Sequence, residues 1–155
     1  MQQSSAIANR RVRYLDELNL ESWRYKRVVQ VLKDYEHFDH IIQAVEESIR
    51  VPYKQDDAAS DRRGTKVVSE TQTEVLYRVE TDKRIVFYRK AQRAVKELLN
   101  ECDTDTKTII NELYIPRYPK YTLDGLVQKN ILSCGRNKAI DKRKQFFKYL
   151  DAMLD

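Results

Sequence analysis

The amino-acid sequence predicts an all-α protein. Glycine and proline are rare, with three of each among 155 residues, whereas charged residues make up 34% of the chain. A β-sandwich would need a turn every ~8–12 residues, and such turns are rich in glycine and proline. Apolar residues also recur three, four and seven positions apart over much of the chain, which is the spacing of a buried helix face. Long, solvated helices therefore fit this sequence best.

Residues 1–51 are expected to form an N-terminal helical module. One helix starts after Ser22, and a second ends at Val51, because Pro52 disfavours the α conformation in the residue before it. The apolar side chains of the module, Trp23 among them, are most simply explained as core. Those of the two helices are Val28, Val31, Leu32, Tyr35, Ile41, Ile42, Val45 and Ile49.

Residues 52–68 are predicted to be a linker, since they hold a proline, a glycine and three aspartates and offer little to bury. Residues 69–100 are predicted to form one long central helix for support or oligomerisation. An alternative is a break into two helices near Thr81, where Thr-Asp could cap a second helix. The apolar surface of this segment exceeds what one small unit can bury, so a homo-oligomer, a dimer or larger, is expected.

Residues 101–155 are predicted to form a helix-turn-helix unit preceded by one support helix. Asp103 or Thr104 can cap the support helix, and Pro116 prevents it from continuing. Thr122 can cap a short helix, residues 130–132 form a turn, and Ser133 is the expected N-cap of a basic last helix. The apolar stripe of that last helix consists of Ile140, Phe147, Leu150 and Leu154.

The positive charge of the chain is concentrated in this last segment. Residues 1–114 hold 20 Lys and Arg against 20 Asp and Glu, whereas residues 115–155 hold 9 against 4. The whole net charge of +5 therefore lies where the basic helix is predicted. Such a concentration is the electrostatic footprint of a nucleic-acid site, with double-stranded DNA as the partner. The alternative is a basic segment without a partner.

The candidate DNA-binding residues divide into two groups. The first turn of the basic helix is where recognition helices touch base edges, and arginine and asparagine can each make bidentate contacts with a purine. The predicted base-contacting residues are Arg136, Asn137 and Lys138. Phosphate contacts, which fix register without specifying sequence, are expected from Lys142, Arg143, Lys144, Arg117, Lys120, Lys129 and Ser133. In the loop before the short helix, Tyr118 and Tyr121 could instead cover the support helix.

Other functional classes find little support. His37 and His40 are three residues apart, but a zinc site needs three or four ligands and none of the usual motifs is present. Asp103 and Asp105 could bind Mg²⁺, although capping is the simpler role. No enzymatic activity, metal or cofactor is predicted. Cys102 and Cys134 imply no disulfide. Neither a signal peptide nor a membrane span is expected, so a cytoplasmic location is predicted.

Four segments in a fixed order carry a resemblance to a known family. They are VVQVLKDYEHFDHIIQAVEESI, VETDKRIVFYRKAQRAVKELL, LLNECDTDTKTIINELYI and TLDGLVQKNILSCGRNKAIDKRKQFFKYL. From about Val28 onward the chain resembles the RinA-type late transcriptional activators of Gram-positive phages and, more loosely, the ArpU-type phage regulators. The last segment resembles the helix-turn-helix of sigma-factor region 4.

The resemblance implies sequence-specific binding at a late promoter in a bacterial host and activation of packaging and morphogenesis genes. Host RNA polymerase is a further expected partner, contacted by the N-terminal helices. Two alternatives remain open. One is a phage DNA-packaging protein such as a small terminase subunit, and the other is a purely helical interaction protein that binds no DNA.

Overall fold

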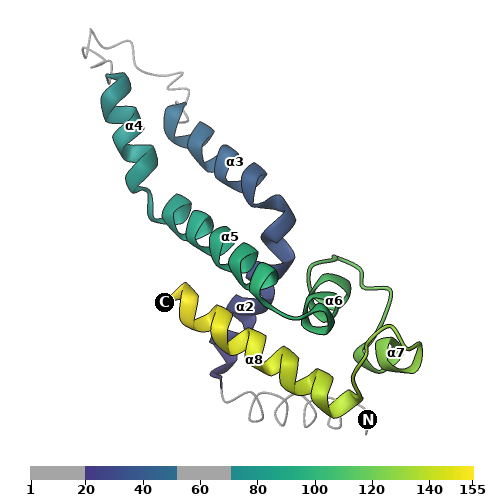
Figure 1. The fold of residues 1–155 in the computed structure, drawn as a ribbon. Helices are drawn as coiled ribbons and strands as arrows, with labels where there is room; N and C mark the ends of the chain where they lie inside the picture. The colour runs from purple at the N-terminus through teal and green to yellow at the C-terminus, as the bar shows by residue number, and fades with distance from the viewer. Residues whose placement is uncertain (1–19, 52–70) are drawn as a thin grey trace, which may run out of the picture. The chain divides into compact units, whose positions relative to one another are not determined.

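The computed structural model describes residues 20–51 and 71–155, and within these ranges every regular element is a helix (Figure 1). The prediction of an all-α fold is therefore confirmed. The described residues fall into two compact units, one of residues 20–36 and 90–155 and the other of residues 37–51 and 71–89. The predicted linker, 52–68, lies outside the described residues. None of the described helices has the length and apolar character needed to cross a membrane.

The smaller unit contains α3 (Phe38–Arg50), α4 (Gln72–Thr81) and the first turns of α5 (Lys83–Glu101). Its core is formed by Ile42, Val79 and Ile85, and Phe38 lies 5.8 Å from the ring of Tyr88. The helix α3 ends at Arg50 with Val51 as its C-cap, as Pro52 predicts. Two apolar stripes in this unit thus face each other rather than solvent.

The predicted single helix over residues 69–100 is wrong, and the alternative break near Thr81 is confirmed. The helix α4 ends at Thr81, and Asp82 takes an extended conformation with φ −62° and ψ 121°. The Asp82 carboxylate then accepts the backbone N–H of Arg84 at 2.9 Å and its guanidinium at 3.0 and 3.1 Å. These bonds lower the pKa of Asp82 to about 2. A side chain that satisfies the orphan N–H groups of α5 stabilises a new helix start at this point.

The larger unit is organised around α8 (Arg136–Leu154), which packs against α2 (Ser22–Asp34), α6 (Thr104–Leu113) and α7 (Leu123–Gln128). The ring of Phe147 lies between two tyrosines, 5.8 Å from Tyr25 and 4.9 Å from Tyr114. The predicted N-terminal module is therefore divided, because α2 packs with the last helix of the chain and α3 packs with α4. Trp23, predicted as core, is 52% exposed and is stacked by two arginines.

The three helices α6, α7 and α8 share a small core of Ile109, Leu126, Leu132 and Ala139. The N-caps of α6 and α7 are residues that the sequence predicts as caps. Asp103 accepts the backbone N–H of Thr106 at 3.2 Å, and Thr122 accepts that of Gly125 at 3.0 Å. The expected helix, loop, short helix, turn and long helix thus occur in the expected order.

The turn after α7 is built from backbone hydrogen bonds. Asn130 has a φ of 54°, in the left-handed region that asparagine tolerates better than most residues. The N–H of Ile131 donates to the carbonyl of Leu126 at 3.0 Å, and that of Asn130 donates to Val127 at 3.1 Å. This pair of bonds is a Schellman motif, which satisfies the last carbonyls of α7 and turns the chain away from its axis. Leu132 then enters the core directly after the turn.

Candidate nucleic-acid interface

The basic helix α8 begins two residues later than predicted, and Ser133 is not its N-cap. The N-cap is Gly135, which has an extended backbone and accepts the N–H of Ala139 at 3.0 Å. Ser133 instead donates its backbone N–H and its hydroxyl to Asp105 on α6, at 3.0 and 2.6 Å. Hydrogen bonds to a carboxylate are stronger than those between neutral groups, so the two bonds that Ser133 donates to Asp105 hold the serine outside the helix.

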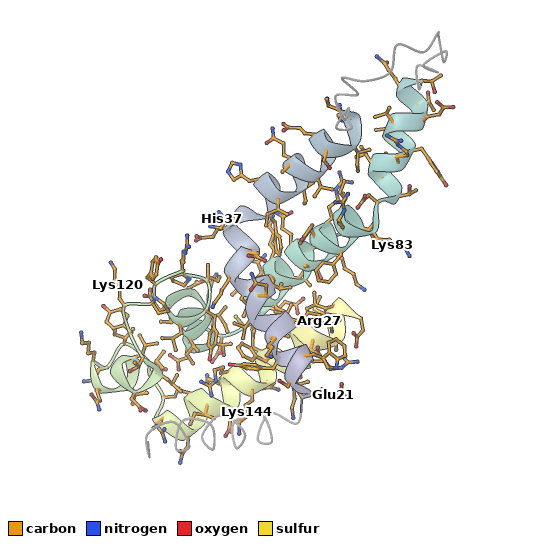
Figure 2. The ribbon with its side chains drawn as sticks, turned by 180° about the vertical axis from the view of Figure 1, so that it is seen from behind. Glu21, Arg27, His37, Lys83, Lys120 and Lys144 are labelled. Carbon is orange, nitrogen blue, oxygen red and sulfur yellow. The ribbon has the colours of Figure 1, made fainter. Side chains whose placement is uncertain are left out.

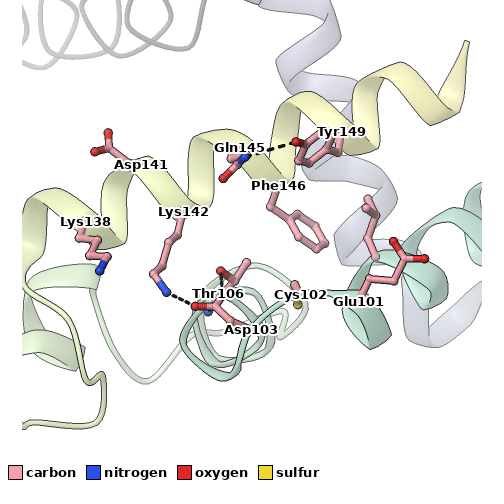
Figure 3. Close-up of a pocket in the computed structure, with 11 residues that line it drawn as sticks. Glu101, Cys102, Asp103, Thr106, Lys138, Asp141, Lys142, Gln145, Phe146 and Tyr149 are labelled. Carbon is pink, nitrogen blue, oxygen red and sulfur yellow. Dashed lines mark hydrogen bonds and ion pairs between the residues drawn. The ribbon is translucent and has the colours of Figure 1, made fainter.

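The contact between Asp105 and Ser133, hereafter the Asp105 bridge, ties the turn before α8 to the first turn of α6. Asp105 is a buried carboxylate, and the two bonds from Ser133 lower its pKa. Lys142 of α8 lies 3.8 Å from Asp105 and forms an ion pair with Asp103 (Figure 3). Together these contacts fix the start of α8 on α6. The sequence had offered Asp103 and Asp105 as caps or Mg²⁺ ligands; Asp103 is a cap, and Asp105 holds the turn.

One face of α8 is buried along its whole length. It consists of Ala139, Arg143, Phe146, Phe147, Leu150, Asp151 and Leu154. Three of the four predicted stripe residues belong to it, whereas Ile140 is half-buried. The stripe is centred one residue earlier than predicted at its start, because Ala139 rather than Ile140 enters the shared core.

Three of the predicted phosphate-contacting residues are committed to contacts inside the larger unit. Arg143 is only 9% exposed, and its guanidinium donates to the Tyr114 hydroxyl at 3.2 Å. Lys142 is paired with the aspartates of α6, and Ser133 forms the Asp105 bridge. Each of the three side chains therefore has an intramolecular partner that an external phosphate would have to replace.

The three predicted base-contacting residues lie in the first turn of α8 and are exposed. The Arg136 side chain is 61% exposed and forms a 2.5 Å ion pair with Asp124 of α7, itself 54% exposed. Lys138 lies on the side of α8 that faces α6 (Figure 3), where its charge acts on Asp105. Asn137 is exposed, and its side chain has no hydrogen-bond partner among the described residues. An exposed pair such as Arg136 and Asp124 contributes little stability, so the arginine can exchange its partner.

The remaining predicted phosphate contacts are accessible. Arg117, Lys120 and Lys129 are exposed, and Lys144 is half-buried. Figure 2 shows Lys120 in the loop before α7 and Lys144 on α8. The guanidinium of Arg117 lies 5.5 Å from the ring of Tyr118, and the ammonium of Lys129 lies 5.0 Å from that of Tyr121. The two tyrosines of the loop therefore differ: Tyr121 packs on the shared core, while Tyr118 is largely exposed.

The sequence analysis did not predict the ion pairs that join α2 to the end of α8. Arg24 and Arg27 of α2 form ion pairs with Asp151 and Asp155 at the end of α8, at 2.6–3.0 Å. The hydrogen bond from Arg24 lowers the pKa of Asp155. One signal was available, because Asp151 follows Phe147 by four residues and so lies within the apolar stripe, where a carboxylate needs a partner.

A groove of about 660 Å³ lies between α8 and the junction of α5 with α6 (Figure 3). Leu98, Phe146 and Tyr149 contribute its apolar surface, and Lys138 and Asp141 lie at its margin. Burial raises the pKa of the Cys102 and Cys134 thiols, which disfavours the thiolate form of both. In the described part of the chain, no three His, Cys, Asp or Glu residues are grouped so as to hold a metal ion.

No protein-family model, curated protein or solved structure matches this chain. The resemblance to the RinA-type activators therefore stays a prediction.

Proposed function

We propose that this protein binds double-stranded DNA sequence-specifically, with α6, α7 and α8 acting as a helix-turn-helix whose α8 enters the major groove. The observation that carries the proposal is the first turn of α8. There, Arg136, Asn137 and Lys138 are exposed at the start of a helix that is anchored by the Asp105 bridge and, from Ala139 onward, by its buried stripe. A rigid helix with a polar, exposed N-terminal turn is what major-groove recognition requires.

The charges around this turn support the same function. Seven of the nine basic residues in 115–155 remain at the surface after Lys142 and Arg143 are set aside: Arg117, Lys120, Lys129, Arg136, Lys138, Lys144 and Lys148. Arg117 and Lys120 precede α7, and Lys129 follows it, so α7 is flanked by cations at both ends. Cations beside a recognition helix neutralise phosphates and hold the helix in register.

The biological role that we propose follows from the resemblance. It is activation of phage or prophage late genes at a promoter, in the cytoplasm of a bacterial host, by a homo-oligomer that contacts RNA polymerase. A dimer would present two α8 helices to half-sites about 34–36 Å apart. Footprints on the phage genome test this role, because protection upstream of the late genes favours it and protection at the packaging start favours a packaging protein.

Replacement of Arg136 tests base recognition directly. We expect Arg136→Ala to weaken binding to a selected site by about 5- to 150-fold, the equivalent of a bidentate base contact of ~1–3 kcal/mol, with much less effect on a scrambled duplex. The matched control is Arg93→Ala, which removes an exposed arginine of α5. Equal loss on both duplexes would remove Arg136 from base recognition, and no retention of DNA at low salt would reject the proposed function.

The salt dependence of binding tests the phosphate contacts. If the exposed lysines and arginines neutralise phosphates, the logarithm of the association constant falls linearly with the logarithm of salt concentration, by roughly 0.9 per phosphate neutralised. Arg117→Ala and Lys120→Ala should each make this slope shallower by about one. A flat profile for the unaltered protein contradicts the assignment of these residues.

A further inference from the structure

The solvent face of α8 is defined by the helix phase. Because its buried stripe includes Ala139, Arg143, Phe146 and Leu150, the opposite face carries residues at positions 137, 141, 144 and 148. These positions follow the spacing i, i+4, i+7 and i+11, so their side chains line one edge of the helix. Recognition helices reach successive bases with residues spaced in this way. The residues there are Asn137, Asp141, Lys144 and Lys148.

Asp141 is the one acidic residue in this row. Its side chain is exposed, and within residues 20–51 and 71–155 no hydrogen bond or ion pair is recorded for its carboxylate. The nearby Lys142 ammonium is directed away from it, toward Asp103 (Figure 3). Asp141 therefore keeps an acceptor facing outward, about a turn beyond the exposed start of the helix.

From this placement we infer that Asp141 is a specificity-determining residue that accepts a hydrogen bond from the exocyclic amino group of a cytosine in the major groove. The inference rests on the proposed function. An ionised carboxylate has only acceptors, and the cytosine N4 amino group is the base-edge donor that aspartate and glutamate pair with most simply. No phosphate oxygen can replace that donor.

The same charge acts against DNA of the wrong sequence. On a duplex without a cytosine at this position, the carboxylate lies close to phosphates and acceptor edges and loses water without gaining a partner. The lysines around it supply attraction that does not depend on sequence. Asp141 thus lowers the affinity for non-cognate DNA. At the cognate site, the hydrogen bond from the cytosine amino group restores the affinity.

Selection from a pool of random duplexes tests the inference with the full-length chain. Three proteins are compared: the unaltered chain, Asp141→Asn, and Glu97→Gln, which removes an exposed carboxylate from α5 and changes the net charge equally. The unaltered chain should select a fixed cytosine that Asp141→Asn no longer requires. In Asp141→Asn the affinity ratio of the selected to a scrambled duplex should fall by at least about fivefold, mainly because scrambled DNA binds more tightly. Glu97→Gln should leave the ratio unchanged.

Each contrary result has a distinct meaning. If the unaltered chain selects a sequence and Asp141→Asn selects the same one with the same ratio, Asp141 does not determine specificity and the proposed function stands. A parallel change in Glu97→Gln assigns the effect to net charge and also overturns the inference. If the unaltered chain enriches no sequence, the proposed function fails, and the role of Asp141 fails with it. Circular dichroism of all three proteins verifies that the exposed substitutions leave the helices intact.

Discussion

The two ends of α8 are held by opposite means. At its start, α8 contributes the positively charged partners of two ion pairs: Arg136 pairs with Asp124, and Lys142 pairs with Asp103. At its end, α8 contributes the negatively charged partners, because Asp151 and Asp155 form ion pairs with two arginines of α2. The start leaves an exposed polar turn, whereas Leu150 and Leu154 bury the end in the core. One continuous helix therefore serves as a surface at one end and as an anchor at the other.

The number of charged residues on a helix does not show which of them pair inside the protein and which remain exposed. Lys142 and Arg143 lie in the middle of the most basic stretch, yet the first is paired with α6 and the second is buried beside Tyr114. Arg136 and Lys138 belong to the same stretch and remain exposed. The position of each residue along the helix separates the two roles, since the buried stripe starts at Ala139 and the residues 136–138 precede it.

The largest effect is expected where the end of α8 enters the core. Phe147 is fully buried between Tyr25 and Tyr114, so Phe147→Ala should reduce the free energy of unfolding by about 3–5 kcal/mol. Urea denaturation followed by circular dichroism measures this loss. Lys148→Ala, one residue later on the exposed face, serves as the control and should change stability by less than about 0.5 kcal/mol. Similar losses in both variants would contradict the assigned helix phase.

A smaller effect is expected at the start of α8, where polar bonds rather than apolar packing hold the helix. Asp105→Ala leaves the Ser133 N–H and hydroxyl without their acceptor and should cost about 1–3 kcal/mol. Ser133→Ala removes only the hydroxyl bond and should cost less. In a double-mutant cycle, the two changes should be less than additive, because they act on one bridge. Full additivity would show that Asp105 stabilises the unit through other contacts.

The Asp105 bridge also predicts a pH dependence. The pKa of the Asp105 carboxyl in the folded protein lies below the ordinary value of 3.8. The ionised carboxylate therefore stabilises the fold at every pH well above 3.8. As the pH falls from that value through the lowered folded pKa, this contribution is lost. Thermal unfolding of the unaltered chain and of Asp105→Ala between pH 6 and pH 2 should therefore converge in the acid range. A constant difference in melting temperature over that range contradicts the bridge.

The smallest effect is expected at the arginine pairs on the end of α8. Arg27→Ala leaves Asp151 bonded to Arg24, and these arginines are partly exposed, so the loss should be about 1 kcal/mol or less. High salt should reduce the difference from the unaltered chain, because screening weakens partly exposed pairs. Calorimetry at two salt concentrations measures both quantities. A loss as large as that of Phe147→Ala would mean that ion pairing, rather than apolar packing, anchors this end of α8.

The sequence by itself determined the elements whose signals are local. Thr122 and Asp103 cap the helices they were predicted to cap, Pro52 ends α3, and Phe147, Leu150 and Leu154 form a buried stripe. Each of these signals involves residues within one or two helical turns. A hydroxyl three residues before an N–H, or apolar side chains seven residues apart, meet through the geometry of the helix itself.

Only the tertiary structure decided which charged residues face outward. Ser133 is bonded to a residue 28 positions away, Arg143 to one 29 positions away, and Asp151 to arginines more than 120 positions away. Local spacing carries no information about such partners, because they meet only after the helices have packed. Once the helices have packed, Ser133 donates both its N–H and its hydroxyl to Asp105, and Gly135 takes the N-cap position of α8. The distribution of net charge along the chain could therefore indicate the region of the candidate site. The packing of α8 determined which residues of that region remain exposed.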